Sequence, residues 1–257
     1  MSTPKTPVYF LSIGGPNFME QTDHPAFHKL GEVGREITTK VQPKAVVVIS
    51  AHWEGSRDTV KINVAEHTDI IYDFFGFPPR YYRYKFPNRG SPEIADQVIE
   101  FLEGAAINVE RAERGLDHGV WVSLFADEDV DMHYRLGQAL APLRQRGIMI
   151  VGAGMAVHNL NDFRRMRVTG QTTMPYASSF DELLSSAVAV SPDQRQKQLR
   201  ALLKTPEAQA AHPTKEHIMP LVVAAGAATS DRGKRLWTYP EGSLIWAQYR
   251  FGELHSQ

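Results

Sequence analysis

A run of β-branched residues, KAVVVIS (44–50), sets the strongest limit on how this chain can fold. Such a run is typical of a strand that is buried on both faces of a mostly parallel sheet. A second apolar run, VYFLSI (8–13), precedes it. Between the two, apolar residues recur at steps of three and four over 26–41, which predicts a helix with one buried face. Strand, helix and strand in this order predict a βαβ unit with a right-handed crossover.

The rest of the chain continues this alternation. GIMIVGAGM (147–155) predicts another buried strand that ends in glycines, and Ser91 and Pro92 suit the N-cap and first turn of a helix. Further strands are expected over 57–66 and 242–251, and further helices over 135–146 and 179–205. Since no repeat or linker interrupts the pattern, we expect one α/β domain, residues 1–257, with a mostly parallel or mixed central sheet and helices on both faces.

The composition excludes several kinds of site and partner. The chain has no cysteine, which rules out disulfides, thiolate nucleophiles and Cys-ligated metals. Its formal net charge of -1 gives no indication of a nucleic-acid or membrane partner. The sequence shows neither the apolar core of a signal peptide nor a membrane-spanning stretch, so a cytoplasmic protein is expected. A monomer and a homodimer are both compatible with these features.

Histidines follow two of the predicted strands. His52 comes directly after KAVVVIS, and His158 lies a few residues beyond IMIVGAG. Because the carboxyl ends of parallel strands meet at one edge of a sheet, we expect both side chains at a shared site. A lone histidine of this kind is more often a structural residue bonded to a neighbouring carbonyl, so the argument depends on the pair.

Two further histidines have an acidic neighbour. Asp117 precedes His118 in a glycine-flanked turn, where a carboxylate can orient an imidazole, although an exposed histidine in an Asx turn fits equally well. Glu216 precedes His217, so either could bind a metal, or both could lie in the first turn of a helix capped by Thr214. Imidazoles with an optional carboxylate suit Zn(II) or Fe(II), which indicates a metal site in an α/β enzyme.

The stretch 70–90 combines prolines and glycines with eight aromatic residues. A long ordered loop is usually functional, so we expect it to form a wall of a substrate pocket, although packing in a core is the commoner use of aromatic side chains. Tyr72 and Phe77 in this loop, together with Trp53 and Asp117, are our candidate substrate-binding residues.

Six stretches occur in a characteristic order along nearly the whole chain: SAHWE (50–54), IYDFFGFPPRYY (71–82), RGLDHGVWVSL (114–124), AVHNL (156–160), HPTKEHIMPLVVAAGAA (212–228) and GSLIWAQYRF (242–251). Together they resemble the class III extradiol ring-cleavage dioxygenases, and specifically the 4,5-DOPA dioxygenase family (LigB-type). No single stretch is specific, but the set is. The resemblance implies a nonhaem metal enzyme that uses O₂ to open the ring of a small catechol beside its hydroxyls.

The resemblance also implies roles for individual residues. By position, His52 and His217 match metal ligands, and the metal is usually Fe(II), with Zn(II) often present in the protein as purified. His158 matches a histidine beside the metal that serves either as a ligand or as the acid–base. His118 matches a histidine that contacts the substrate or transfers protons. The catalytic candidates are therefore His118 and His158.

One position departs from the pattern of the family it resembles. The first strand of that family normally ends in Ser-His-Gly, and this histidine ligates the metal. Here the triplet is Ser12-Ile13-Gly14, and an isoleucine side chain has no lone pair to offer. The altered ligand position, Ile13, therefore puts the metal site itself in question.

Three outcomes are open for the metal site. A metal can be retained through His52, His158 and His217, a three-imidazole set known for zinc. His24 or His28 can supply the missing ligand, which we regard as the less favoured outcome because a different loop path is needed. Alternatively, the metal affinity is lost, because losing a ligand should weaken binding more than losing one of the residues that orient the ligands.

Three functions correspond to these outcomes. The leading hypothesis is an extradiol dioxygenase-like oxidoreductase for a small catechol with an altered metal site. The alternative is a metal-deficient, non-catalytic or repurposed homologue that binds an aromatic ligand or a partner. A third and weaker hypothesis is a metal-dependent hydrolase with a three-histidine zinc site.

Overall fold

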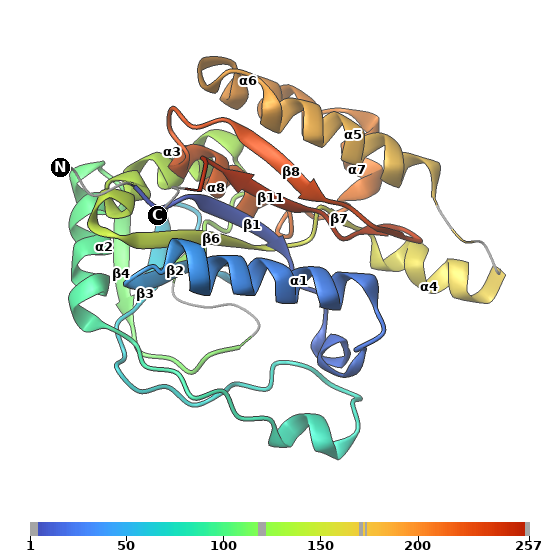
Figure 1. Cartoon of the computed structure of the whole chain (residues 1–257), viewed down its shortest axis with the longest axis horizontal. Coiled ribbons are helices and arrows are strands. Elements are labelled where there is room, and N and C mark those ends of the chain that lie inside the picture. The colour runs from blue at the N-terminus through green and yellow to red at the C-terminus, as the bar shows by residue number, and fades with distance from the viewer. Residues whose placement is uncertain (1–4, 118–121, 170–171, 173, 255–257) are drawn as a thin grey trace.

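The computed structural model, described for residues 5–117, 122–169, 172 and 174–254, contains an eight-stranded mixed sheet with helices on both faces (Figure 1). The strands lie in the order β4-β3-β5-β2-β6-β1-β11-β8. Their bounds are β1 (Val8–Ser12), β2 (Ala45–Glu54), β3 (Thr59–Asn63), β4 (Asn108–Ala112), β5 (Val122–Leu124), β6 (Ile148–Gly154), β8 (Gly233–Trp237) and β11 (Gln248–Phe251). The fold class expected from the sequence is confirmed.

The centre of this sheet is parallel. β2 pairs in parallel with both β5 and β6, and β6 pairs in parallel with β1. β11 and β8 extend the sheet by antiparallel pairing beyond β1. The carboxyl ends of β1, β2 and β6 consequently meet at one edge, which is where ligands bind in open α/β sheets.

A second, three-stranded sheet lies near this edge. It consists of β7 (Val157–His158), β10 (Leu244–Ile245) and β9 (Pro240–Glu241), in the order β7-β10-β9 with antiparallel pairing throughout. The chain leaves β6 at Gly154 and enters β7 three residues later. This small sheet therefore continues the end of β6 toward the site described below.

Helices cover both faces of the large sheet (Figure 1). Their bounds are α1 (Pro25–Glu36), α2 (Pro92–Gly104), α3 (Val130–Leu140), α4 (Leu160–Thr169), α5 (Pro175–Ala189), α6 (Pro192–Leu202), α7 (Pro206–Ala211) and α8 (Met219–Ala227). Short helical segments lie at η1 (Pro16–Glu20), η2 (Ile37–Val41), η3 (Pro79–Arg83) and η4 (Ala141–Arg146). Among the residues that the structure describes, no helix has the length and apolarity needed to cross a bilayer.

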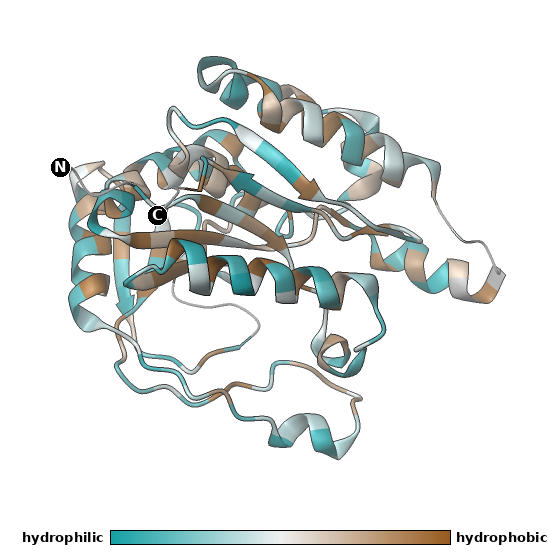
Figure 2. Ribbon diagram, viewed as in Figure 1, coloured by the Kyte–Doolittle hydropathy of each residue, from teal (hydrophilic) through white to brown (hydrophobic). Residues whose placement is uncertain are grey.

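The alternation of side chains along the strands explains how these layers pack. On β1, Val8 and Phe10 join the main core together with α8, whereas Tyr9 faces Val33 of α1 on the opposite side. α8 is buried along its whole length and packs closely against α3 and β6. Figure 2 shows the same division, with apolar residues along the central strands and polar residues on the outer side of α1.

Several predicted elements are confirmed with changed limits. β2 continues past residue 50 to Glu54, so His52 lies inside the strand rather than after it. The single helix expected over 179–205 is wrong, because α5 ends at Ala189 and Pro192 begins a new helix. Proline lacks the N–H that would continue α5 and suits a first helical turn. The strand expected over 242–251 is likewise divided into β10 and β11.

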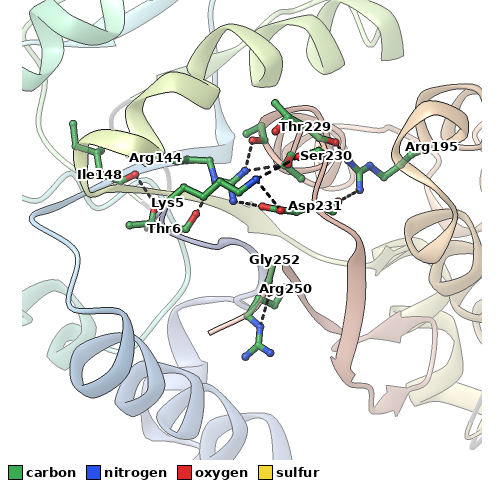
Figure 3. Close-up of polar contacts among 12 residues, drawn as sticks. Lys5, Thr6, Arg144, Ile148, Arg195, Thr229, Ser230, Asp231, Arg250 and Gly252 are labelled. Carbon is green, nitrogen blue, oxygen red and sulfur yellow. Dashed lines mark hydrogen bonds and ion pairs between the residues drawn. The ribbon is translucent and has the colours of Figure 1, made fainter. Parts of the chain in front are cut away.

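Two buried arginines hold the carboxyl end of α8 (Figure 3). The Arg144 guanidinium donates to the carbonyls of Ala227 and Ala228, at 3.0 Å each, and pairs with Asp231. The Arg195 guanidinium donates to the carbonyls of Thr229 and Asp231, at 2.8 and 2.6 Å. These bonds satisfy carbonyls that a helix end leaves without partners, and the cations suit the negative end of the helix dipole.

Candidate metal site and substrate pocket

Three histidines from distant parts of the sequence converge at the carboxyl edge of the sheet. His52 comes from β2, His158 from β7, and His217 from the segment that leads into α8. The rings of His158 and His217 stack with centroids 3.6 Å apart, and the centroid of His52 lies 5.2 Å from that of His217. The sequence-based expectation of a shared location for His52 and His158 corresponds to this arrangement.

Glycines in β6 set the position of His217. A Cβ at Gly154 would lie 2.2 Å from the carbonyl oxygen of His217, and one at Gly152 would lie 2.3 Å from that of Pro220. The absence of side chains here lets the start of α8 rest directly on β6. The Met155 N–H then donates to the His217 carbonyl at 3.1 Å, which ties the histidine to the end of the strand.

A carboxylate accompanies the histidines. Glu216 Oε1 lies 4.0 Å from His158 Nδ1 and 3.9 Å from His217 Nε2, and the three residues form a group able to hold a metal ion. Two ligand atoms of a tetrahedral Zn(II) ion lie about 3.4 Å apart when the metal–ligand distances are about 2.1 Å. Both separations here are slightly longer, so small side-chain movements would bring these groups to one ion.

The protonation of His158 suits metal binding. Burial lowers its pKa to about 4, an effect that His52 reinforces and Glu216 opposes. The imidazole is therefore neutral near pH 7 and has a lone pair for a metal or a proton. Imidazole and carboxylate donors are the ligands that Zn(II) and nonhaem Fe(II) take, so the residues present fit such an ion even with Ile13 in the chain.

Ile13 itself offers no ligand to this group. It follows β1, is half-buried, and donates its backbone N–H to the Gly154 carbonyl at 3.0 Å. The next residue, Gly14, has φ +67°, and a Cβ there would lie 2.2 Å from the Trp246 ring. The chain therefore turns away from β1 closely beneath Trp246.

The structure places His24 and His28 away from the three histidines. His24 is the N-cap of α1, where its Nδ1 accepts from the Ala26 N–H at 3.1 Å, and its Nε2 contacts Glu241. His28 is exposed on α1, with its ring against Phe27. In this arrangement neither residue stands in for the histidine that the family pattern has at position 13.

A pocket of about 820 Å³ opens beside the histidines. Its described lining residues come from the turn after β1, from β2, from the aromatic loop, from α4 and from the small sheet. They are Gly14, Gly15, Pro16, Asn17, Phe18, Gln21, His52, Asp73, Phe74, Met155, His158, Leu160, Phe163, His217, Glu241, Leu244 and Trp246. A cavity of about 830 Å³ between β2 and the start of α2 is equally large, but no histidine lines it, so the first pocket is the candidate site.

The four residues expected to bind substrate lie outside this lining. Trp53 is buried beneath the Arg114 guanidinium, 4.7 Å from its ring centroid, and Arg114 also pairs with Asp117. Tyr72 donates to the Tyr84 carbonyl at 2.7 Å, within the aromatic loop. Their part in substrate binding remains a prediction.

Phe77, the fourth of these residues, packs against the rings of Phe74 and Tyr81. From the same loop, Phe74 and Asp73 are the residues that reach the pocket. The Asp73 carboxylate also lies 3.9 Å from Nδ1 of His52. His118, the expected proton-transfer residue, lies outside the described residues.

Glu20 joins the two walls of the pocket. Its carboxylate accepts two hydrogen bonds from Arg80, at 2.8 and 2.7 Å, and further ones from the hydroxyls of Tyr81 and Tyr84, at 2.5 and 3.1 Å. These bonds lower the pKa of Glu20 to about 2. They hold the aromatic loop against η1, and the sequence contains no local signal for the pairing, since the partners lie at least sixty residues apart.

Sequence patterns also gave no indication of the residues at the far end of the pocket. Trp246 stacks on Phe18 with centroids 4.5 Å apart, and its Nε1 donates to Glu241 at 2.7 Å. Glu241 was given no role from sequence because it lies in a short polar turn without a motif. Its position in the pocket depends on the pairing of β9 with β10.

Comparisons with known proteins identify relatives of this chain. Residues 2–242 match the family model for the catalytic LigB subunit of aromatic ring-opening dioxygenase. A 4,5-DOPA dioxygenase extradiol of Beta vulgaris is 35% identical, over 95% of both chains. One of the same name from Escherichia coli is 32% identical, over 88% of this chain and 87% of its own. The crystal structure of an uncharacterized Escherichia coli K12 protein, 26% identical, superposes with a TM-score of 0.74 over 96% of this chain and 100% of its own.

Proposed function

Because this chain belongs to the LigB family of aromatic ring-opening dioxygenases, we propose that it opens the ring of a small catechol with O₂ in a nonhaem, metal-dependent reaction. The observation that supports this best is the convergence of His52, His158 and His217 beside one pocket. We assign this reaction to residues 1–257 as one catalytic domain.

His158, Glu216 and His217 lie close enough together to hold the metal, and His52, whose ring lies beside that of His217, would be a further ligand. The ion would be Fe(II) in the active enzyme, or Zn(II) in protein as purified. When bound, it supplies a positive charge that lowers the pKa of the catechol hydroxyls and holds both reactants in one place. This arrangement differs from the family pattern because Ile13 stands where a histidine ligand is expected.

The remaining residues bind and orient the substrate. The stacked rings of Phe18 and Trp246 offer a flat apolar surface for an aromatic ring, and Phe74 and Phe163 help to exclude water. A neutral His158 has one lone pair, so it serves either as a metal ligand or as the acid–base that accepts the proton of a catechol hydroxyl. His118 is proposed as a second proton-transfer residue.

A metal-deficient homologue that only binds an aromatic ligand is the second candidate, and Ile13 is the observation that favours it. Metal content separates the two. After anaerobic incubation with Fe(II) and desalting, the dioxygenase should retain about one iron per chain, as expected for a site with three or four protein ligands. Iron that is absent from the natural chain but regained in Ile13→His would favour the binding protein.

Oxygen uptake then tests the reaction. The iron-loaded protein should consume O₂ in the presence of a catechol and produce a ring-opened product. The proposed function fails if neither the natural chain nor Ile13→His consumes O₂ with any of a panel of catechols. Ester hydrolysis that a chelator abolishes would instead indicate the zinc hydrolase.

A further inference from the structure

We propose that Asp73 is a positioning residue for the metal site: its carboxylate accepts the Nδ1–H of His52 and thereby leaves Nε2 of that imidazole to bind the metal. The inference rests on the proposed function, because it takes His52 as a metal ligand. It goes further by naming the residue that orients this ligand and the ring nitrogen that binds the ion.

His52 is the candidate ligand whose orientation matters most. The ligand atoms of His158, Glu216 and His217 already lie within 4.8 Å of one another, whereas His52 is not part of that group. The side chain of His52 is 32% exposed, so packing alone does not fix its ring. Because Ile13 contributes no ligand, the metal affinity depends on fewer groups, and what orients His52 becomes correspondingly important.

Two contacts limit how the His52 ring can turn. The ring meets that of His217 edge-on, with the centroids 5.2 Å apart and the planes at 90°. Its Nδ1 lies 3.9 Å from Oδ2 of Asp73. This separation is longer than a hydrogen bond, but a movement of about 1 Å by either side chain brings the two atoms to the usual N–H···O distance of about 2.9 Å.

A carboxylate at this place fixes the position of the ring proton. An ionised carboxylate can only accept, so a neutral imidazole beside it carries its proton on Nδ1 and its lone pair on Nε2. Metal-binding histidines commonly donate their other N–H to such a group, which orients the ring and raises its basicity. Asp73 is itself outside the group of His158, Glu216 and His217, so it acts through His52 rather than on the ion.

The aromatic loop holds Asp73 from both sides. The hydroxyl of Tyr72, the preceding residue, donates to the Tyr84 carbonyl at 2.7 Å. The carbonyl of Phe74, the following residue, accepts from the Tyr82 hydroxyl at 3.2 Å, and the rings of this second pair lie 5.0 Å apart. The carboxylate is thus presented to the pocket, which it lines, from a segment tied down on either side.

Zinc affinity tests the role of Asp73 without O₂ or a catechol. Metal-free protein is titrated with Zn(II) against a chromophoric chelator. In Asp73→Asn, which keeps the shape of the side chain and removes its charge, we expect Zn(II) to bind about 10–100-fold more weakly. Asp69→Asn is the matched control, because it removes the same charge from an exposed position of the chain just before the loop, outside the lining of the pocket. It should bind Zn(II) within about twofold of the natural chain.

The tautomer of His52 separates orientation from charge, since the loss of any nearby negative charge weakens the binding of a cation. Long-range ¹H–¹⁵N correlation at about pH 8, where an ordinary imidazole is neutral, reports it, and the signals are assigned by their loss in His52→Gln. The metal-free natural chain and Asp69→Asn should hold the Nδ1–H form. Asp73→Asn should show both forms, because an amide donates as well as accepts. With Zn(II) bound to the natural chain, Nε2 should be the coordinating atom.

The inference is overturned if Zn(II) binds Nδ1 of His52, if Asp73→Asn binds Zn(II) as tightly as the control, or if the natural chain binds no Zn(II). A weaker affinity with an unchanged tautomer also contradicts it, because Asp73 would then act only through its charge.

These outcomes are distinct from failure of the proposed function. A chain that binds Zn(II) through a His52 oriented by Asp73, but consumes no O₂ when loaded with iron, would support the inference and contradict ring opening. Ring opening by a chain whose Zn(II) affinity does not depend on Asp73 would contradict the inference alone.

Discussion

The imidazole of His212 donates a hydrogen bond from Nε2 to the carbonyl oxygen of Ala156, at 2.9 Å. His212 is buried, and burial lowers its pKa to about 3, so it is neutral near pH 7. Ala156 lies two residues before His158, and its N–H donates a hydrogen bond to Ser12 Oγ at 3.1 Å. The segment that carries His158 is therefore held through both backbone polar groups of Ala156.

We expect His212→Phe to destabilise the protein by about 1–3 kcal/mol, because the buried Ala156 carbonyl loses its donor. The variant should also bind metal more weakly, since His158 is no longer held in register. Urea unfolding gives the first quantity and metal titration the second. His28→Gln, which changes an exposed histidine on α1, is the control and should alter neither.

Stability should fall as the pH is lowered from about 6.5 toward 4. Burial lowers the pKa of His133 to about 4, that of His212 to about 3 and, in metal-free protein, that of His158 to about 4. The unfolded chain takes up these protons first, so each group contributes stability above pH 6.5 that is progressively lost below it. The expected slope is about 1.4 kcal/mol per pH unit for each such histidine.

Urea unfolding of metal-free protein at pH 7.0, 6.0 and 5.0 measures this slope above the range in which most carboxylates titrate. In His212→Phe the slope of stability against pH should decrease by about 1.4 kcal/mol per pH unit, the contribution of one histidine. A stability that does not change between pH 7 and pH 5 would contradict the assignment of neutral, buried imidazoles.

Gly154→Ala should disrupt the metal site. The new Cβ would lie 2.2 Å from the backbone carbonyl of His217, so the start of α8 must move away from β6. We expect a destabilisation of about 1–3 kcal/mol from overpacking and a loss of metal affinity of at least tenfold. Gly34→Ala is the matched control, because Gly34 lies in α1 and the added carbon meets only open space. Alanine has a higher helix propensity than glycine, so this variant should be at least as stable as the unsubstituted protein.

Glu20→Gln should loosen the aromatic loop without unfolding the protein. The change removes the charge that binds Arg80 and weakens the bonds from Tyr81 and Tyr84. We expect faster amide hydrogen exchange over 72–84 and a several-fold higher KM for catechols, with a smaller change in kcat, because the loop forms a pocket wall rather than the metal site. Glu66→Gln, which breaks an exposed pair with Arg89, should leave KM unchanged. Equal exchange in both variants would contradict the role of Glu20.

Rules that concern neighbouring residues were sufficient for much of the fold. The β-branched run of β2, the N-cap Ser91, which accepts from the Ile94 N–H, and the glycine-ended β6 were all predicted from local patterns. The bounds of α8 were not predicted, because its residues are apolar on every side and show no helical period, as expected for a helix buried all round. The alternative of a helix capped by Thr214 is wrong, since the N-cap is Ile218 and His217 lies before the helix. β5 was missed because three residues are too few for a pattern.

The sequence by itself determined that His52 and His158 reach one edge of the sheet, because the carboxyl ends of parallel strands meet at one edge whatever the loops do. It also determined that Ile13 offers no lone pair. Only the tertiary structure decided which residues close the pocket. Glu20 meets Arg80, and Glu241 faces the histidines across Leu244, through loop packing and strand register that bring together residues far apart in the chain. Such contacts leave no trace in local periodicity, which records only how a segment buries its own apolar face.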